Sequence, residues 1–416
     1  MMGVNAISIY ALLFASLYFE VFLLITFFEW REKEQAEQRE RVRRMPNNAL
    51  PSVTIAVPCF NENTTIEKTL YSLLALDYPK EKLSIVAIDD GSTDGTFETL
   101  THFTRHPQIR VMRKENGGKH TALNVALQNV TTDLFGCLDA DSFVEKNALL
   151  EIVRYFEDSH VSAVTPAIKV YKADNLISLL QRAEYTLSIF IRRTFSHMNA
   201  LFITPGPFSL FRVSIFETLG PYRAAHHTED LEIALRMHAH GMRIENAHRA
   251  IVYTHVPKTF GALFRQRLRW SYGFLKNIFE YRFLFFKPRY GILGMCILPL
   301  TILSFVSALY FFSILLFSAG MRIVAKIAEV KVIGLASLMP NAFDWFFVNT
   351  QPLLFLSIII VGLTIILIAI GKKLLQEKRL FSLDLVCYFA FYWLIAPLWL
   401  SKALYCVIVG KKTSWR

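Results

Sequence analysis

Two aspartates separated by a single alanine follow a short apolar run near the middle of the chain. They are Asp139 and Asp141 of the stretch "CLDADSF" (137–143). Like charges at this spacing repel each other, so the pair needs a positive partner. Hard divalent cations take oxygen ligands, and Mg²⁺ is commonly held by one or two carboxylates together with substrate phosphates. The pair therefore predicts a divalent-cation site, and an Asx-type turn or helix cap is the alternative.

A second pair of acids, Glu229 and Asp230, lies at the start of a predicted helix in "HTEDLEIALRMHAHGM" (227–242). Acidic side chains are favoured at a helix N-terminus because they interact with the helix dipole. The pair is therefore either a simple cap or a site of general-base chemistry, in which Asp230 takes a proton from a hydroxyl group.

Two glycine-containing stretches add further polar groups. "DDGSTDGT" begins with Asp89 and Asp90, and "ENGGKHTALN" contains Lys119 just before a predicted helix. Backbone amides at a helix N-terminus, together with a lysine, can bind a phosphate. The sequence has no G-x-x-x-x-G-K-[ST] loop, however, and each stretch taken alone is also typical of a turn.

Four polar stretches, "PCFNE", "DDGSTDGT", "ENGGKHTALN" and "DADS", each lie at the end of a short apolar segment. The segments are predicted strands at 52–60, 83–90, 109–114 and 134–141. Apolar strands that alternate with helices predict an α/β fold with a mostly parallel sheet covered on both faces. Ligands bind beyond the carboxyl ends of such strands, so we expect the polar stretches to form one site.

The chain also contains long segments without charge. Residues 7–28 carry only Glu20, and three later windows carry no charged side chain: 291–320, 351–371 and 385–401. About 20 apolar residues in a helix span a bilayer core, so the sequence predicts four transmembrane helices. An acid inside a membrane usually faces a cavity, which makes Glu20 a candidate pore-lining residue. A carboxylate that reaches the membrane interface is the alternative.

The charges beside the predicted spans indicate how the chain crosses the membrane. Residues 31–44 contain six basic and four acidic side chains, and an excess of Lys and Arg beside a span marks the cytoplasmic side. We therefore expect a cytoplasmic polar block, four spans and both termini outside. A broken or re-entrant last helix around Pro397 is the alternative. No A-x-A type cleavage site follows the first span, which predicts a retained anchor rather than a signal peptide.

The predicted organisation has four parts: an N-terminal transmembrane helix (1–30), a cytoplasmic α/β domain (45–258), an amphipathic helix (259–288) and a C-terminal transmembrane region (289–416). Arginines alternate with apolar residues in the third part and in 175–193, as is typical of helices in a membrane interface. The net charge is +11. Because much of the basic charge flanks apolar segments, we expect membrane lipids rather than nucleic acid as its partner.

Four motifs occur in a fixed order along the polar block. They are "IDDGSTDGT", "DADS", "TED" and "QRLRW", the last just before the predicted C-terminal spans. This order resembles the processive family 2 glycosyltransferases, which include cellulose, hyaluronan, chitin-oligosaccharide and poly-N-acetylglucosamine synthases. The resemblance covers residues 50–285 by motif and the flanking spans by architecture. It implies a GT-A-type catalytic fold in 45–258, inserted between transmembrane helices, and an inverting reaction with Mg²⁺ or Mn²⁺ as cofactor.

The resemblance also implies how a UDP-sugar donor is bound. The residues that match the family's donor site are Pro58, Asn61 and Glu62 for the nucleoside pocket, Asp89 and Asp90 for the uracil, Lys119 for the diphosphate, and Asp139 and Asp141 of the D-x-D motif for the nucleotide and the metal ion.

The later motifs match the catalytic and acceptor side of the family. Asp230, with Glu229 beside it, matches the catalytic base. The motif that holds the diphosphate and stacks near the acceptor sugar is matched by Gln266, Arg269 and Trp270. "PGPFSLFR" (205–212) resembles the loop that meets the acceptor, although Pro205 stands where relatives often have serine or cysteine.

The resemblance, together with the predicted spans, implies a plasma-membrane enzyme that elongates a β-linked polysaccharide from a UDP-sugar and passes it into or across the membrane. The span layout favours UDP-N-acetylglucosamine, because it resembles the poly-N-acetylglucosamine and chitin-oligosaccharide synthases. The expected partners are the donor, the growing polysaccharide, membrane lipids and a small membrane subunit, with no nucleic acid. The alternatives are a non-processive transferase that adds one sugar to a lipid carrier, and a basic, membrane-anchored nucleic-acid-binding protein.

Overall fold

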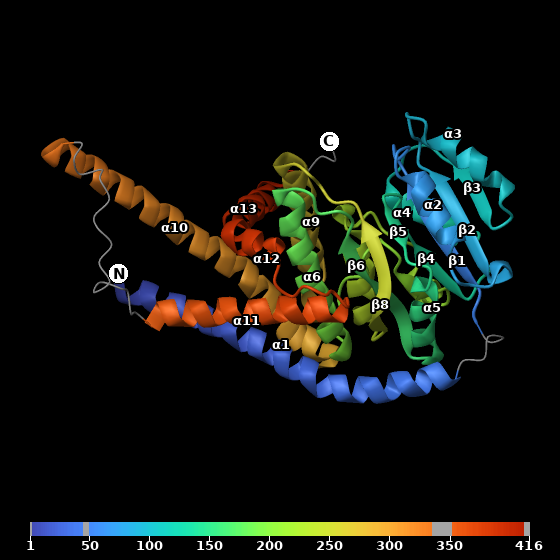
Figure 1. Ribbon diagram of the computed structural model, residues 1–416, viewed down its shortest axis with the longest axis horizontal. Coiled ribbons are helices and arrows are strands. Elements are labelled where there is room, and N and C mark those ends of the chain that lie inside the picture. The colour runs from blue at the N-terminus through green and yellow to red at the C-terminus, as the bar shows by residue number, and fades with distance from the viewer. Residues whose placement is uncertain (1, 45–49, 335–351, 412–416) are drawn as a thin grey trace.

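The computed structural model describes residues 2–44, 50–334 and 352–411. An α/β domain forms one end of the molecule and long helices form the other (Figure 1). The first helix, α1 (Met2–Arg44), belongs to both parts. Its N-terminal half lies beside α11 (Pro352–Leu374), and its C-terminal half runs along the α/β domain.

The α/β domain is built on an eight-stranded sheet with the order β3-β2-β1-β4-β7-β6-β8-β5. Its first half contains the four predicted strands, all parallel: β1 (Val53–Cys59), β2 (Leu83–Asp89), β3 (Ile109–Arg113) and β4 (Leu134–Cys137). Successive residues of a strand point to opposite faces. Ile55 and Val57 therefore pack in the core on one face of the sheet, and Ala56 packs in the core on the other.

The fourth strand ends earlier than predicted. It leaves the sheet after Cys137, and the chain turns at Asp139, whose carbonyl accepts a hydrogen bond from the Ser142 amide at 2.9 Å. Asp139 and Asp141 therefore lie in a turn beyond the strand rather than in the strand itself.

The second half of the sheet is mixed. β7 (Leu210–Arg212) is antiparallel to both β4 and β6 (Val161–Val170), β8 (Arg243–Thr254) is parallel to β6, and β5 (Ser142–Val144) is antiparallel to β8. The expectation of a mostly parallel sheet therefore holds for the first half alone. β5 and β7 are only 3 residues long, so neither carries an apolar run that a sequence pattern could detect.

Helices cover both faces of the sheet (Figure 1). The helices of the α/β domain are α2 (Ile66–Leu74), α3 (Thr96–Thr101), α4 (Lys119–Leu127), α5 (Ala148–Val153), α7 (Ile215–Leu219) and α8 (Glu229–Ala239). Short 3₁₀ turns lie at Lys80–Lys82, His102–Arg105, Arg154–Glu157, Ala225–His227, Arg282–Leu284 and Pro288–Tyr290.

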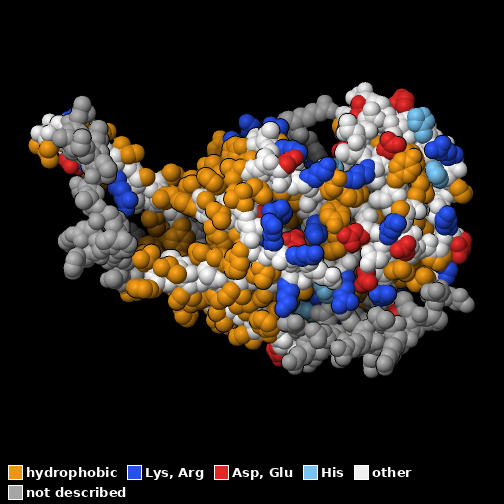
Figure 2. Space-filling view, in the orientation of Figure 1, with side chains coloured by type: hydrophobic (Ala, Val, Ile, Leu, Met, Phe, Trp, Pro, Cys, Tyr) orange, Lys and Arg blue, Asp and Glu red, His pale blue; other side chains and the backbone are white. Residues whose placement is uncertain are grey.

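Within the described residues, four helical segments are long and apolar enough to cross a membrane: Ile7–Trp30, Leu293–Ile333, Pro352–Leu374 and Leu383–Val409. They correspond to the four predicted spans. The second begins with a π-helical turn (Leu293–Ile297) and continues as α10 (Leu298–Ile333). Apolar side chains cover this end of the molecule, whereas charged side chains are spread over the α/β domain (Figure 2).

The last span is one helical segment. α12 (Leu383–Cys387), a π-helical turn (Tyr388–Tyr392) and α13 (Trp393–Val409) follow one another directly, and Pro397 lies inside α13. A proline removes one helical hydrogen bond and crowds the preceding turn, and a wider π turn nearby is a common adjustment. The helix therefore passes Pro397 without the break considered as the alternative.

Two helices join the α/β domain to the membrane helices, and both lie in the stretches predicted to be amphipathic. α6 (Leu176–His197) begins with a capping box between Asn175 and Ser178 and packs on α11. α9 (Phe260–Glu280) packs on α13, where Tyr272 contacts a small cluster around Ala403.

A buried ion cluster fastens the C-terminal helices to α6. Lys372 of α11 and Asp384 of α12 are both fully buried, with Nζ and Oδ1 3.1 Å apart. Arg182 of α6 approaches the other carboxylate oxygen of Asp384 at 3.2 Å. Because a buried charge is stable only beside its partner, the three side chains hold α6, α11 and α12 together.

Candidate active site

The carboxyl ends of the strands bring the predicted charged residues into one recess. The Lys119 ammonium, at the start of α4, lies 2.5 Å from Oδ1 of Asp139 and 3.4 Å from Oε1 of Glu229. Burial alone would lower the pKa of Lys119, but the Asp139 and Glu229 carboxylates raise it well above its ordinary value. The recess is lined by Lys119, Leu123, Cys137, Thr204, Pro205, Gly206, Ser209, Phe211, Tyr222, Glu229 and Asp230.

The two aspartates of the turn after β4 have the properties of a divalent-cation site. Burial, and then the neighbouring Asp139 carboxylate, raise the pKa of Asp141 to about 7, although Ser142 donates a hydrogen bond to it at 2.9 Å. The two carboxylates repel each other, and a cation bound beside them, in addition to Lys119, would reduce this repulsion. No group of three or more potential metal-ligating side chains occurs among the described residues. Two carboxylates alone could therefore hold a divalent ion only together with substrate phosphates and water.

A tight loop packs the "PGPFSLFR" stretch against these carboxylates. A β-carbon on Gly206 would collide with the Lys119 ammonium and lie 2.8 Å from Oδ1 of Asp139, so only glycine fits without displacing this ion pair. The loop is fixed to β4, because the Phe208 amide donates to the Cys137 carbonyl at 2.6 Å. The sequence placed this loop near the acceptor; the structure adds that it touches the D-x-D carboxylate.

The same loop also holds the start of α8. The backbone amide and the hydroxyl of Thr204 both donate to the carbonyl of Asp230, at 3.1 and 2.9 Å. The Asp230 carboxylate accepts from the Leu231 amide at 2.9 Å. Burial, and then the adjacent Glu229, raise the pKa of Asp230 to about 6. A carboxylate with this pKa is largely ionised at neutral pH and still basic enough to accept a proton.

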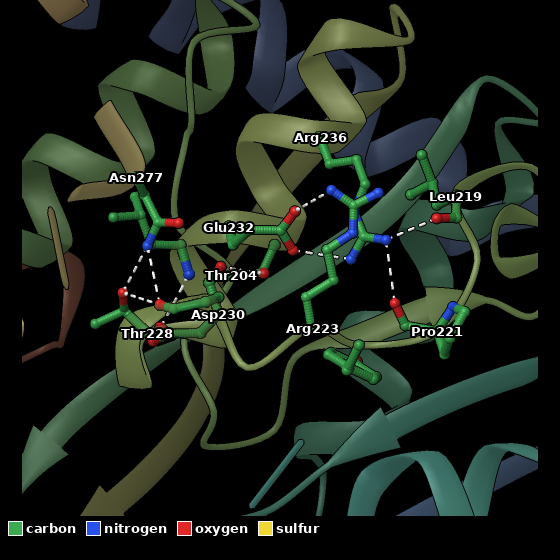
Figure 3. Close-up of polar contacts among 12 residues, drawn as sticks. Thr204, Leu219, Pro221, Arg223, Thr228, Asp230, Glu232, Arg236 and Asn277 are labelled. Atoms are coloured by element: carbon green, nitrogen blue, oxygen red, sulfur yellow. Dashed lines mark hydrogen bonds and ion pairs between the residues drawn. The ribbon is translucent and has the colours of Figure 1, made fainter. Parts of the chain in front are cut away.

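The loop before α8 has an unusual backbone. Ala225, His226 and His227 are consecutive residues in the left-handed region, with φ of 44°, 53° and 70°. Each such residue costs about 1–3 kcal/mol unless its surroundings hold it there. Asn277 of α9, which is fully buried, donates to the Ala225 carbonyl at 3.1 Å and to the Thr228 hydroxyl at 2.8 Å (Figure 3). The interface helix therefore holds the loop that leads to Asp230.

A second contact ties α8 to α9. Glu232, two residues after the candidate base, accepts a hydrogen bond from Arg236 at 2.8 Å and from the Tyr281 hydroxyl at 2.5 Å. Arg236 in turn donates to the carbonyls of Leu219 and Pro221 (Figure 3). Sequence reasoning missed Glu232 and Arg236, although their spacing of four residues on a predicted helix is a recognised ion-pair signal.

The Q-x-x-R-W motif lies on α9, beside the candidate base. The Arg269 guanidinium is close enough to His227 to add to the effect of burial and lower the His227 pKa. Trp270 is 37% exposed, and the Arg267 guanidinium lies over its ring at 4.3 Å. The amide oxygen of Gln266 is buried and lacks a hydrogen-bond partner within the described part of the chain.

Sequence reasoning missed a pair of residues on α6 that faces this motif. Glu184 forms an ion pair with Arg267 at 2.7 Å. Burial of its hydroxyl raises the pKa of the adjacent Tyr185, and Arg267, Arg192 and Asp141 are near enough to influence it. α6 and α9 therefore both border the space above the carboxylates, a relation that depends on tertiary packing and leaves no signal in either segment alone.

The loop after β2 is ordered by its aspartates. Asp90 accepts hydrogen bonds from the amides of Gly117 and Gly118 at 3.0 and 2.9 Å, and from the Lys114 ammonium at 2.6 Å. Asp89 forms an ion pair with Arg113 at 3.1 Å. The Asp90 carboxylate thus shapes the Gly-Gly-Lys loop directly, a role that the sequence did not predict.

The loop after β1 adjoins the loop after β2. Pro58 lies in β1 opposite Ile88. Asn61, with a φ of 57°, accepts a hydrogen bond from the Thr93 amide at 2.9 Å. Burial raises the pKa of Glu62, and Asp139 adds to the shift, so Glu62 lies near the D-x-D turn. The predicted nucleoside residues are therefore neighbours of the predicted metal ligands.

Fold and site define a GT-A-like α/β protein joined to membrane helices. The model of the family described as "Glycosyltransferase like family 2" matches residues 51–273. The chain belongs to this family, as the motif resemblance implied.

Curated relatives share this region. The chain is 34% identical over 227 residues to the poly-β-1,6-N-acetyl-D-glucosamine synthase of Staphylococcus aureus (strain COL), covering 54% of this chain and 55% of that protein. It is 29% identical over 264 residues to the protein of the same name from Staphylococcus epidermidis, covering 63% of each. The matches thus span between about half and two thirds of these relatives' length.

A solved structure resembles nearly the whole chain. It is a mannosyltransferase from Pyrobaculum calidifontis in complex with GDP-Man and Mn²⁺, with a TM-score of 0.60 and 20% sequence identity. The match covers 95% of this chain and 99% of that one. At this identity the likeness concerns the fold alone, and it includes the membrane-associated helices as well as the α/β domain.

Proposed function

We propose that this protein is an inverting, processive glycosyltransferase that elongates β-linked poly-N-acetylglucosamine from UDP-N-acetylglucosamine. The observation that carries the proposal is the arrangement of charges in the recess: the Lys119–Asp139 pair lies beside Glu229, and Asp230 follows it at the start of α8. Relatives at 29–34% identity, which bear the name poly-β-1,6-N-acetyl-D-glucosamine synthase, support this choice of donor and product.

The first part of the proposed reaction is the departure of UDP from the donor sugar. Asp139 and Asp141 are the residues that would hold Mg²⁺ or Mn²⁺, and the bound ion would neutralise the diphosphate. Lys119 remains charged because its pKa is raised, and Arg269 supplies a second cation from α9. Fixed positive charges stabilise the negative charge that grows on a leaving diphosphate.

The second part of the proposed reaction is the activation of a hydroxyl group on the acceptor sugar. Asp230 accepts the hydroxyl proton as the oxygen attacks the anomeric carbon from the face opposite UDP. One direct displacement inverts that carbon, so an α-linked UDP-sugar yields a β-linkage. The pKa of about 6 supports this role, since the carboxylate is ionised before the acceptor arrives.

Polar groups among the membrane helices support passage of the product into or across the membrane. Glu20 of α1 points to the neighbouring helix α11, where Thr364 donates a hydrogen bond to it at 2.6 Å. Tyr392 of the last span lies near Glu184 of α6, and Glu184 forms an ion pair with Arg267 inside the Q-x-x-R-W motif. We propose that the α/β domain is cytoplasmic at the plasma membrane, on the strength of the basic residues in 31–44. A small membrane partner subunit stays a prediction.

The test is an assay of the purified protein in lipid nanodiscs against UDP-N-acetylglucosamine, UDP-glucose, UDP-glucuronic acid and GDP-mannose. Each donor is supplied with Mg²⁺, Mn²⁺ or EDTA. We expect UDP release with UDP-N-acetylglucosamine and a divalent ion, and a product that a β-1,6-specific N-acetylglucosaminidase digests. Turnover of another donor only would refute the proposed substrate.

Product length separates the proposal from its alternative. Radiolabelled donor should yield long chains while most acceptor molecules remain unextended, because a processive enzyme keeps its product bound. A product that carries one added sugar, extractable into organic solvent with a lipid carrier, would instead identify a non-processive transferase.

A further inference from the structure

One hydroxyl group of the catalytic recess is buried without a partner. The Tyr222 side chain lines the recess and is 5% exposed, and its hydroxyl lacks a hydrogen-bond partner among the residues that the structure describes. The two other hydroxyls that line the recess are bonded, since Thr204 donates to the Asp230 carbonyl at 2.9 Å and Ser209 donates to the Pro205 carbonyl at 2.6 Å. The large majority of buried polar side-chain atoms in folded proteins are hydrogen-bonded. The Tyr222 hydroxyl therefore needs an explanation.

The ring of Tyr222 packs on the face of the sheet that leads to the D-x-D turn. Its centroid lies 6.5 Å from the ring of Phe135 on β4 and 6.3 Å from the ring of Phe211 on β7. These two phenylalanines are opposite each other in the antiparallel pair of strands. Cys137, two residues after Phe135, points to the same face and also lines the recess. Tyr222 therefore lies where the last residues of β4 meet the recess.

The backbone of Tyr222 is fixed as firmly as its ring. The side-chain amide of Asn124 donates to the Tyr222 carbonyl at 2.9 Å, and the side-chain oxygen of Asn124 accepts from the Tyr222 amide at 2.8 Å. Asn124 belongs to α4, the helix that begins with Lys119. A phenylalanine at residue 222 would make the same ring and backbone contacts. The hydroxyl thus adds nothing to the packing, and it is held in place for a group that enters the recess.

The hydroxyl of Tyr222 has the hydrogen-bonding properties of a sugar-binding group. Burial, and then the nearby Cys137, raise the pKa of Tyr222 well above its ordinary value, so the hydroxyl stays protonated at neutral pH. A neutral hydroxyl both donates and accepts hydrogen bonds, and so does the hydroxyl of a sugar. A diphosphate is bound by cations instead, and Lys119 already supplies one in the recess.

The position of the recess indicates the donor sugar rather than the acceptor chain. Lys119, which pairs with Asp139 at 2.5 Å, and Asp230 both border the recess. The anomeric carbon has to lie between the leaving diphosphate and the hydroxyl that Asp230 activates, so the donor sugar occupies the space that these residues border. That space, with its open mouth included, is about 240 Å³. It is smaller than the roughly 300–1,000 Å³ of pockets for larger ligands, and so it suits one sugar rather than a chain.

We infer that the Tyr222 hydroxyl binds the donor sugar, through a hydrogen bond to one of the sugar's own hydroxyl groups. The inference rests on the proposed function, since it takes the ligand to be a UDP-hexose. Tyr222 is then a specificity-determining residue. A sugar in which that hydroxyl is missing would leave the buried Tyr222 hydroxyl unpaired, and a site built to hydrogen-bond one group rejects the analogue that lacks it.

The variant Tyr222→Phe removes the hydroxyl and keeps the ring. Isothermal titration of the full chain in nanodiscs with Mn²⁺, without acceptor, measures the Kd of UDP and of UDP-N-acetylglucosamine. We expect the affinity for UDP-N-acetylglucosamine to fall about 2- to 12-fold, the range for a hydrogen bond between neutral groups. The affinity for UDP should stay within about twofold of the native value. The melting temperature should stay the same or rise, because the lost hydroxyl has no partner in the free protein.

Analogues of UDP-N-acetylglucosamine that lack one hydroxyl each (3-deoxy, 4-deoxy and 6-deoxy) identify the bonded group. The native protein should bind one of them more weakly than the intact donor. For that analogue Tyr222→Phe should cause no further loss, because the partner of the Tyr222 hydroxyl is already absent.

Tyr78→Phe is the matched control for these measurements. Tyr78 is 7% exposed, and its hydroxyl donates to the Pro51 carbonyl at 2.5 Å on the other side of the sheet from Tyr222. Loss of this bonded hydroxyl should lower the melting temperature and leave the affinities for UDP and UDP-N-acetylglucosamine at their native values.

Three results for Tyr222→Phe would overturn the inference. They are an unchanged affinity for the UDP-sugar, which would leave the hydroxyl to an ordered water molecule, an equal loss of affinity for UDP, and a melting temperature lowered as in Tyr78→Phe. The proposed function is tested separately, by turnover in the native enzyme. If the native enzyme uses a different nucleotide sugar, the proposed donor is wrong, and Tyr222→Phe is then measured against that sugar and its deoxy analogues.

Discussion

The backbone of Gly206 lies against the side chain of Asp139, so closely that a β-carbon at residue 206 would be 2.8 Å from Oδ1. Replacing Gly206 with Ala should push Asp139 and its Lys119 partner out of place. We expect kcat for polymer synthesis to fall at least about 100-fold while the melting temperature changes little, because the clash is local.

Gly261→Ala is the control for that variant. Its nearest neighbour would be the Arg265 guanidinium at 3.8 Å, an ordinary contact distance, so activity should be unaffected. Equal activity of the two variants would show that the loop can move away from Asp139 at no cost.

The acid limb of the pH–rate profile should report Asp230. Because its pKa is raised to about 6, the carboxyl becomes protonated as pH falls through that value and can no longer accept a proton. With a saturating divalent ion, which would keep Asp141 ionised, we expect kcat/KM to be flat above about pH 7 and to fall about tenfold per pH unit below pH 6. Asp230→Asn should abolish synthesis at every pH and leave UDP affinity unchanged. Substantial synthesis by Asp230→Asn would exclude this residue as the base.

Asp141 should connect donor binding to a divalent cation. In the native protein, isothermal titration should give UDP binding with Mn²⁺ that weakens at least about tenfold in EDTA. Asp141→Asn should bind UDP weakly whether or not Mn²⁺ is present. Asp174→Asn is the control, since Asp174 is half-exposed and pairs with Lys258 at the surface. Equal UDP affinity in Mn²⁺ and in EDTA would show that no metal ion takes part in donor binding.

Asn277 should control the position of the base from the neighbouring helix. Asn277→Ala removes the donors to Ala225 and Thr228, and the loss of buried hydrogen bonds should cost about 1–3 kcal/mol of stability. We expect kcat to fall more than KM for the donor, because the loop moves Asp230 but not the D-x-D turn. Thermal unfolding and steady-state kinetics measure the two effects. A variant with reduced stability and native kcat would show that this loop contributes to stability but not to catalysis.

The buried cluster at Asp384 should be necessary for attachment of the last two spans. Asp384→Asn leaves Lys372 charged and without its partner, which typically costs about 3–5 kcal/mol. We expect a lower melting temperature in detergent and faster proteolysis near residue 378. The double variant Lys372→Met/Asp384→Leu removes both charges and should recover much of the loss. A double variant as unstable as the single one would contradict this account.

The first half of the sheet could be predicted because its strands carry continuous apolar runs. Ile55, Val86 and Ala87 are buried within such runs, and the polar residues after them mark the strand ends. β5 and β7 could not be predicted, because three residues beside a functional turn have no periodicity of their own. The membrane spans were predicted from their lack of charge, and the structure has the same four segments.

The site residues also divide into those that local sequence motifs predict and those that only tertiary packing reveals. Lys119, Asp139, Glu229 and Asp230 were predicted from motifs, and the structure brings them to one recess. Asn277, Glu232 and Tyr185 were missed, because their importance comes from helices that pack together over a long sequence distance. Asp90 was assigned by resemblance to the nucleotide, yet its contacts with the Gly-Gly-Lys loop are visible only in three dimensions.

The left-handed run at Ala225–His227 sets a limit on how this enzyme can be dissected. The loop's shape is maintained by α9, and α9 is seated on the last span through Tyr272. A soluble fragment cut before residue 259 would retain the loops after β1 and β2, whereas the loop before Asp230 would relax into an ordinary turn. We expect such a fragment to bind the donor without turning it over. Activity screens on truncated protein would therefore give a false negative result.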